Sequence, residues 1–450
     1  MNNRSRLRPR NKRRARAPFV ALLVIFLALA AGTLFAVNIM DGPETVASAG
    51  DTAQGGIAPG TTIVHVTNVN DDGAGSLREA VMLKSPRVVI FDIAGIIHLK
   101  KDLKISSPYI TIAGQTAPDP GIILTGAALR IRSHDVIIQH ISVRSGPART
   151  TKDNDNRDAL SIDGSSTSEK HQSYNVRVEN ITATWSVDET VSLWFPTTRE
   201  VTVTNSIIAE ALNNAGHPKG PHSMGLLIGS GVEEAQITGN LLVSNAFRNP
   251  VMVQGAEAFV ANNLIYNPGQ NAIHFYPKQG SGPTRISLVN NVVIKGPDTK
   301  KHIAGLLIPT AFKQRDADRI YISGNYFQLG PYGTKMAINP DLRLAETPPI
   351  ISSTWQLRTD IDVPKLVLRY AGSRPARRSL LDRALVAGVQ RRQSRIIDLP
   401  PALGNGAPIV RIAQIPTDPF EVTSDGQTKL ARWLCKLHLD VGGMPNNKCR

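Results

Sequence analysis

The sequence predicts an all-β fold: a parallel β-helix, or solenoid, with a short N-terminal capping helix and a C-terminal helix followed by an irregular tail. The 450-residue chain has 36 Gly, 30 Pro and only 5% aromatic residues, which favours short strands and turns over long helices. From about Ile63, short apolar runs alternate with turn residues. One phrase, an apolar strand ending in Asn and followed by another apolar strand, recurs at intervals of 23 to 35 residues. Its asparagines are Asn180, Asn205, Asn240, Asn263, Asn291 and Asn325. A period in the low twenties with variable insertions is typical of a solenoid rather than a sandwich.

The N-terminal segment, residues 1–49, is expected to direct export. Residues 1–17 carry eight Arg and Lys and no acid, and residues 17–40 carry no charge. As a helix, the uncharged run would be about 36 Å long, enough to cross a bilayer. It is therefore either a transmembrane signal-anchor or a signal peptide cleaved near Ala47-Ser48-Ala49. Either way we expect a secreted or periplasmic protein that touches the membrane only through this segment, with residues 50–61 as a linker.

Residues 62–372 are assigned to the β-helix. Ser76 and Glu79 have the spacing of a capping box, which predicts a short helix covering the first coil. Each coil has an apolar inner side that only stacking can bury. The repeated asparagines are expected to hydrogen-bond along the stack, although Asn is also common in turns for local reasons.

Residues 373–450 are expected to form a helix and a tail. Leu380, Leu381, Leu385 and Val389 have helical spacing within 374–395, and the arginines of that segment are expected to face water. Residues 400–450 look irregular. Cys435 and Cys449 are the only cysteines and predict a disulfide in an oxidising compartment.

The positive charge is concentrated at the two ends of the chain. The formal net charge is +15, with +8 in residues 1–17 and +8 from Gln356 onward, which leaves about −1 for residues 18–355. Net charge therefore does not indicate a polyanion site in the central body. Nucleic-acid binding is disfavoured because no aromatic residues are interleaved with the terminal bases.

Candidate functional residues lie in the longer insertions, which in solenoids gather on one face. Asp163 and Asp188 are 25 residues apart, about one coil, and are expected to stack. Stacked carboxylates with Glu189 next to them would favour a hard cation such as Ca²⁺. The alternative for each aspartate is turn capping.

Two further groups have more than one interpretation. His217, Lys219 and His222 could line a polar cleft, or the histidines could be incidental to a Gly/Pro-shaped loop; zinc is disfavoured because no third ligand has a defined spacing. Arg248 follows a strand and has no acid near it in sequence, so it is either functional or paired with a loop carboxylate.

Taken together, the segments "GAGSLREAV", "IAGQTAP", "DALSIDGSS", "TWSVDET", "GHPKGPHSMG" and "FRNP" resemble polysaccharide lyase family 1, the pectate lyase-like right-handed parallel β-helix proteins. The resemblance implies β-elimination on an acidic polysaccharide, with Ca²⁺ at the substrate carboxylate and an arginine as the base. It assigns Arg248 as the catalytic residue, and Lys219 and His222 as candidates for substrate binding. It assigns Asp163 and Asp188 to the metal, with Glu189 as a possible substitute ligand.

The chain departs from the family pattern at three places. Ser192 stands where a second acid is expected four residues after Asp188, and Val253 stands where a second arginine is expected. The substrate-binding lysine would fall near Ser223. These departures imply a weaker, substrate-dependent Ca²⁺ site.

The leading hypothesis is an exported, monomeric polysaccharide lyase that cleaves a uronic-acid-containing, pectate-like polysaccharide. A non-catalytic β-helix that binds or scaffolds surface glycan is the alternative, motivated by the departures. A glycoside hydrolase on the same scaffold would need two carboxylates at acid/base spacing across a cleft.

Overall fold

The computed structural model describes residues 53–57, 60–165, 172–279, 282–352, 362–404, 406–445 and 449. The predicted N-terminal signal or anchor and most of the linker lie outside the described residues. Among the described helices, none is long and apolar enough to span a bilayer.

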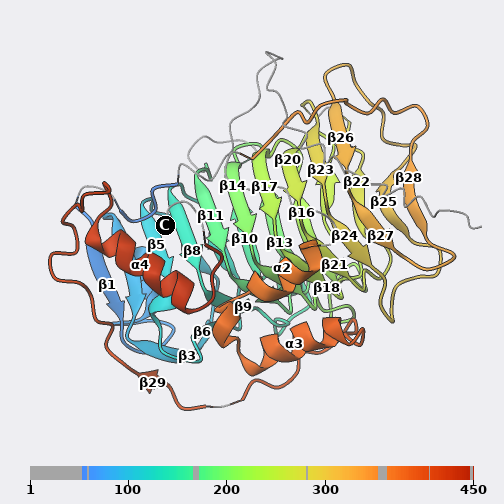
Figure 1. The fold of residues 1–450 in the computed structure, drawn as a ribbon. Helices are drawn as coiled ribbons and strands as arrows, with labels where there is room; N and C mark the ends of the chain where they lie inside the picture. The colour runs from blue at the N-terminus through green and yellow to red at the C-terminus, as the bar shows by residue number, and fades with distance from the viewer. Residues whose placement is uncertain are drawn as a thin grey trace, which may run out of the picture. The chain divides into compact units, whose positions relative to one another are not determined.

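The strands form three parallel sheets, each built from one strand of every successive coil (Figure 1). Sheet 1 contains β1 (Thr62–Val66), β2 (Arg87–Phe91), β5 (Ile110–Ala113), β8 (Val136–Gln139), β11 (Val176–Glu179), β14 (Arg199–Thr204), β17 (Glu233–Thr238), β20 (Glu257–Ala261), β23 (Arg285–Val289) and β26 (Arg319–Ser323). Sheet 2 contains β4 (Leu103–Ile105), β7 (Leu129–Ile131), β10 (Leu160–Asp163), β13 (Glu189–Trp194), β16 (Met224–Ile228), β19 (Val251–Val253), β22 (Ile273–Tyr276), β25 (Ala304–Ile308) and β28 (Thr334–Ile338).

Sheet 3 contains β3 (Ile93–His98), β6 (Ile122–Thr125), β9 (Ile141–Arg144), β12 (Thr182–Thr184), β15 (Ile207–Ala209), β18 (Leu241–Val243), β21 (Leu264–Tyr266), β24 (Val292–Ile294) and β27 (Tyr326–Gln328). A short strand of the C-terminal segment, β29 (Ile409–Val410), pairs antiparallel with β3. Inward side chains of all three sheets form one continuous apolar core along the stack. The predicted parallel β-helix is confirmed.

The asparagine ladder is real but shorter than expected. The side-chain Nδ2 of Asn240 donates to Asn263 Oδ1 (3.1 Å), and the pattern repeats from Asn263 to Asn291 and from Asn291 to Asn325 (both 2.9 Å). Asn180 does not belong to it: its Nδ2 donates to backbone carbonyl oxygens of Asn205, Tyr370 and Gly372. The prediction of a ladder of six asparagines is therefore wrong for the first two, Asn180 and Asn205.

The reason is a one-residue offset. Asn205, like Asn180, occupies the turn position before the ladder, where the backbone is left-handed (φ +48° and +52°). Asn262 and Gly239 fill that turn position in later coils. In the coil of Asn205 the ladder position itself is taken by Ser206, whose backbone N–H donates to Asn240 Oδ1. Asn tolerates positive φ, so the same residue type serves two neighbouring positions.

The first coil is capped by α1 (Leu77–Met82), as predicted. The Ser76 hydroxyl accepts a hydrogen bond from the Glu79 backbone N–H at 3.2 Å. The reciprocal bond differs from a standard capping box, because Glu79 Oε2 accepts from the N–H of Gly75 rather than of Ser76 (2.7 Å). Two short 3₁₀ helices, η1 (Gly114–Thr116) and η2 (Lys152–Asn154), lie in loops between strands.

The C-terminal segment is more ordered than the sequence indicated. It contains α2 (Asp362–Tyr370), η3 (Pro375–Arg377), α3 (Leu380–Gln390) and α4 (Lys429–Asp440). Apolar residues of α2 and α3 pack on the outer side of sheet 3, and Leu430 and Leu434 of α4 pack on the outer side of sheet 1 (Figure 1). The Cys435–Cys449 disulfide is present, as predicted.

One arginine of this segment contradicts the expectation of a water-facing basic surface. Arg374 is fully buried, where it donates to Asp119 Oδ1 at 2.5 Å and to the Ala117 carbonyl oxygen at 2.8 Å. It ties the C-terminal segment to an early turn of the β-helix. Apolar spacing could identify the helix but not a polar anchor next to it.

Candidate active site

The candidate site lies on the outer side of sheet 2. The loops before β10, β13 and β16 and the turn before β19 bring its side chains together. Parallel pairing in register aligns these four strands, so residues far apart in sequence meet at one edge.

Three carboxylates converge at the start of β13. One oxygen each of Asp158, Asp188 and Glu189 lies within 4.8 Å of the others. Burial, with the nearby charge of Asp188, raises the pKa of Asp158 to about 7. Burial also raises the pKa of Asp188, opposed by the positive charges of His217, His222 and Arg248 when these are protonated. Three carboxylates this close together would repel one another if all were negatively charged. The cluster therefore favours a bound cation or a shared proton.

Ser192 contributes to this cluster from the same strand. Its Oγ donates to Asp158 Oδ2 at 2.6 Å. The other oxygen of Asp158 is buried and has no hydrogen-bond partner among the described residues. A buried carboxylate oxygen without a donor is an open coordination position.

Asp163 lies elsewhere, and its predicted stacking on Asp188 is wrong. The register pairs Asp163 with Trp194, six residues beyond Asp188. Asp163 instead forms ion pairs with Arg132 (3.3 Å) and Arg130 (3.5 Å). The aspartate that meets Asp188 is Asp158, because the loop between the coils is six residues longer than an even 25-residue period assumes.

The two histidines stack on each other beside the cluster. The rings of His217 and His222 lie 3.4 Å apart and nearly parallel. His222 Nε2 lies 3.4 Å from Asp188 Oδ1, and His217 Nε2 lies 3.8 Å from the same oxygen. His217 Nδ1 accepts the backbone N–H of Lys219 (3.1 Å), so the Nε2 of a neutral His217 carries the proton and points it at the carboxylates. His217 Nε2 is buried and has no hydrogen-bond partner among the described residues. One ligand atom each of Asp188, His217 and His222 lies within 4.8 Å of the others, so Asp188 is the third potential metal ligand that the sequence spacing did not define.

Lys219 lies at the rim. Its side chain is 69% exposed, and its Nζ lies 3.2 Å from Asp155 Oδ1. A long, exposed ammonium group can leave such a surface ion pair at little cost.

Arg248 joins the cluster from the turn before β19. Its guanidinium forms an ion pair with Glu189, and its side chain is 30% exposed. Burial lowers the pKa of Arg248, while the negative charges of Asp188 and Asp158 act to raise it. The pairing of Arg248 with a carboxylate, one of the two interpretations from the sequence, is observed, and that carboxylate belongs to the candidate site.

No family model matches the chain, but curated proteins do. A probable pectate lyase C of Aspergillus flavus is 33% identical over 275 residues, 60% of this chain and 57% of the relative. A probable pectate lyase C of Aspergillus fumigatus is 29% identical over 340 residues, 72% of this chain and 71% of the relative. The chain is related in sequence to the pectate lyases. It spans a little over half the length of the A. flavus relative.

Solved structures show a similar arrangement at low sequence identity. A pectate lyase from Bacillus sp. N165 in complex with trigalacturonate has a TM-score of 0.48 and 15% identity, covering 74% of this chain and 98% of that one. The major cedar pollen allergen jun a 1 has a TM-score of 0.49 and 14% identity, covering 72% and 91%.

The residues of this site fit a calcium ion. Asp158, Asp188 and Glu189 supply hard, anionic oxygens, and Asp158 offers an unpartnered one. Ser192 stands where the family pattern has an acid and gives a neutral hydroxyl, so the site has fewer charges than that pattern.

Two residues next to the site were missing from the sequence-based set. Asp158 precedes Leu160 in the acidic loop before β10. The structure pairs Leu160 with Val191, and a sequence alignment of the two coils in this register would have placed Asp158, rather than Asp163, beside Asp188. His274 of β22 is buried near Arg248. Burial, with a smaller effect from the positive charge of Arg248, lowers the pKa of His274 to about 4. No sequence motif distinguishes His274 from an ordinary buried histidine.

Proposed function

We infer that the chain is an exported polysaccharide lyase that cleaves an acidic, pectate-like polysaccharide by calcium-assisted β-elimination. One observation carries this inference: Arg248 meets the Asp158, Asp188 and Glu189 cluster on the one sheet face that lacks a packed helix among the described elements. A base next to a cation-binding carboxylate cluster is what proton abstraction beside a uronate carboxylate requires.

Asp158, Asp188 and Glu189 would hold the calcium ion. When bound, calcium would neutralise the uronate carboxylate and acidify the proton at C5. Arg248 would take that proton; the C5–H electrons form the C4–C5 double bond, and the glycosidic oxygen at C4 leaves with its bonding pair and is protonated by water. The burial that lowers the pKa of Arg248 favours this role, because only the neutral guanidinium can accept a proton.

Lys219 and His222 are proposed to bind the substrate. The exposed ammonium of Lys219 can exchange Asp155 for a uronate carboxylate. Burial is the main cause that lowers the pKa of His222, so the neutral ring is favoured and can hydrogen-bond to sugar hydroxyls.

The test is product formation by the full chain and by Arg248→Lys. We would incubate each with polygalacturonate, with calcium or with chelator, and follow the ultraviolet absorbance of the 4,5-unsaturated product. Arg248→Lys should lower the rate by at least about 100-fold, the usual contribution of a positioned base. Chelator should remove the activity of the unmodified chain.

Arg285→Lys is the matched control. Arg285 pairs with Glu257 at 2.5 Å on sheet 1, and the side-chain exposures of that pair, 40% and 10%, are close to those of Arg248 and Glu189, 30% and 9%. It should retain activity. Equal activity of Arg248→Lys and the unmodified chain would refute the catalytic role.

The ion pair between Arg248 and Glu189 favours one alternative, a non-catalytic β-helix that binds acidic glycan. A protein of this kind would bind polygalacturonate without releasing unsaturated product from any uronan. Export is proposed from the basic N-terminus and the uncharged run at residues 17–40.

A further inference from the structure

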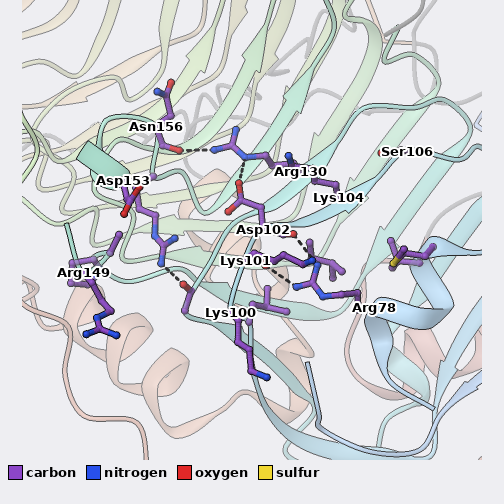
Figure 2. A pocket seen from close by; sticks show the side chains of 18 of the residues that line it. Arg78, Lys100, Lys101, Asp102, Lys104, Ser106, Arg130, Arg149, Asp153 and Asn156 are labelled. Atoms are coloured by element: carbon purple, nitrogen blue, oxygen red, sulfur yellow. Dashed lines mark hydrogen bonds and ion pairs between the residues drawn. The ribbon is translucent and has the colours of Figure 1, made fainter. Parts of the chain in front are cut away.

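A polar groove lies on the first coils, and Arg248 is not among the residues that line it. It encloses about 1200 Å³ between α1, the strand β4 and the loop at residues 147–157. Two acids line it, Asp102 and Asp153. The basic residues that line it are Arg78, Lys100, Lys101, Lys104, Arg130, Arg149, Lys152 and Arg157 (Figure 2). Eight cations facing two acids give the groove a formal charge of +6.

Part of this charge is already neutralised. Arg130 Nε donates to Asp102 Oδ2 at 2.6 Å, and its other nitrogens donate to Ser161 Oγ and to the Asn156 carbonyl oxygen. Arg78 pairs with Asp71 at 2.6 Å. These two arginines are held by several bonds each and form a fixed floor for the groove (Figure 2).

Of the remaining six cations, Arg157 donates to the backbone carbonyl oxygens of Gly126, Ser145 and Gly146, and the other five are not neutralised by any described residue. Within the described ranges, no side-chain partner is found for Lys100, Lys101, Lys104, Arg149 or Lys152, and all five are exposed. In Figure 2, dashed bonds reach the labelled arginines Arg78 and Arg130, whereas the side-chain ends of Lys100 and Arg149 have none. Like charges that gather in one concave surface raise the local positive potential and attract an anion.

The groove leads to the candidate active site along sheet 2. The strand register places Lys104 beside Arg130, Arg130 beside Ser161, and Ser161 beside Ser192. Ser192 is the residue that contacts Asp158. Three strand spacings of about 4.8 Å put Lys104 about 14 Å from Ser192, and side chains in one such row project from the same face of the sheet.

We propose that this groove binds a length of the acidic polysaccharide beyond the part that enters the active site. The inference rests on the proposed function for the identity of the polymer. The carboxylates of the chain would lie against Lys100, Lys101 and Lys104, whose ammonium groups act as mobile point charges. A nucleic acid is the poorer fit, because the described lining contains no aromatic side chain on which a base could stack.

The test measures binding separately from cleavage. The parent would be the full chain with Arg248→Lys, so that the polymer stays intact, and the groove variant would add Lys100→Gln, Lys101→Gln and Lys104→Gln to it. Dissociation constants for long polygalacturonate and for trigalacturonate would be measured in chelator at low and high salt. The triple variant Lys335→Gln, Lys365→Gln, Lys436→Gln is the matched control, because these lysines are equally exposed and lie on β28, α2 and α4.

We expect the groove variant to bind the long polymer on the order of tenfold more weakly at low salt, since each exposed cation contributes a factor of about two to three. High salt should shrink the difference, and the control should bind like the parent. Long polymer should bind the parent more tightly than trigalacturonate does, and the groove variant should lose that advantage.

Equal affinity of the groove and control variants for the long polymer would overturn the proposal. A groove variant that weakens trigalacturonate as much as the polymer would also overturn it, because the lysines would then act on the active site itself. Either result is independent of whether the chain proves to be a lyase.

Discussion

Ser192→Asp should strengthen the proposed cation site, at the expense of stability without calcium. Ser192 is buried on β13, and its hydroxyl donates to Asp158 at 2.6 Å. An aspartate there removes this donor and adds a fourth carboxylate to the three whose oxygens already lie within 4.8 Å of one another.

Two effects set the magnitude. A hydrogen bond to a charged acceptor contributes about 1.5–3 kcal/mol. Two carboxylates about 4 Å apart repel by about 4 kcal/mol at an effective dielectric constant of 20. A shared proton relieves part of the repulsion, since Asp158 already has its pKa raised to about 7. We therefore expect the free energy of unfolding in chelator to fall by on the order of 3 kcal/mol at neutral pH.

Calcium should reverse the sign of the effect, because a cation among four carboxylates turns repulsion into attraction. An affinity gain of at least about tenfold corresponds to about 1.4 kcal/mol of additional stabilisation at saturating calcium. Denaturant unfolding across a calcium titration measures both the stability without calcium and the stabilisation by calcium. It would be carried out on the unmodified chain, Ser192→Asp and Ser192→Asn. Ser192→Asn has nearly the same volume as aspartate and no charge. If Ser192→Asp gains no more stability from calcium than Ser192→Asn does, the carboxylates do not form a cation site.

Two further predictions concern the scaffold. Asn263→Ala should lower the free energy of unfolding by roughly 3 kcal/mol, because it leaves buried donors and acceptors of its ladder neighbours unpaired. Asn325→Ala, at the partly exposed end of the ladder, should lower the free energy of unfolding by less. Equal losses for the two variants in denaturant titrations would contradict a buried ladder. Burial, with smaller effects of His438 and Arg374, lowers the pKa of His140 well below 6.5 in the folded state. The unfolded chain therefore binds the extra proton first, and stability should fall by about 1.4 kcal/mol per pH unit below about pH 6.5. His140→Asn should have a flatter dependence, and an unchanged slope would argue against this histidine.

Periodicity predicted the architecture because it is a property of the whole chain. Six asparagine phrases and many short apolar runs all require coils that stack, and the loss of any one would not alter the conclusion. The same argument could not fix which asparagine faces inward. Asn180 and Asn205 occupy the left-handed turn position, whereas Asn240 occupies the ladder position. The turn position and the ladder position are one residue apart.

The residues of the candidate site were harder to predict than the fold, because they too depend on the register between coils. The loops before β10 and β13 decide whether Asp158 or Asp163 meets Asp188, and loop length does not follow from strand pattern. Arg248 stood out in the sequence because it follows an apolar run and has no acid near it, and in the structure it lies in the turn before β19. Its partner Glu189 is adjacent to Asp188, and adjacent residues within a strand face opposite sides. Glu189 is the first residue of β13, where the strand begins, and its carboxylate joins the cluster.

The pairing of Arg248 with Glu189 would link the proposed base to the proposed cation site. A carboxylate bound to a cation is a weaker partner for a guanidinium than a free carboxylate is. Calcium bound by the cluster would compete with Arg248 for Glu189, and it would offset the negative charges of Asp188 and Asp158, which act to raise the pKa of Arg248. Because burial already lowers the pKa of Arg248, offsetting these charges would shift Arg248 further toward the neutral form that can accept a proton. The ion pair with Glu189, which by itself suggests a structural arginine, would then join the proposed base to the proposed metal site.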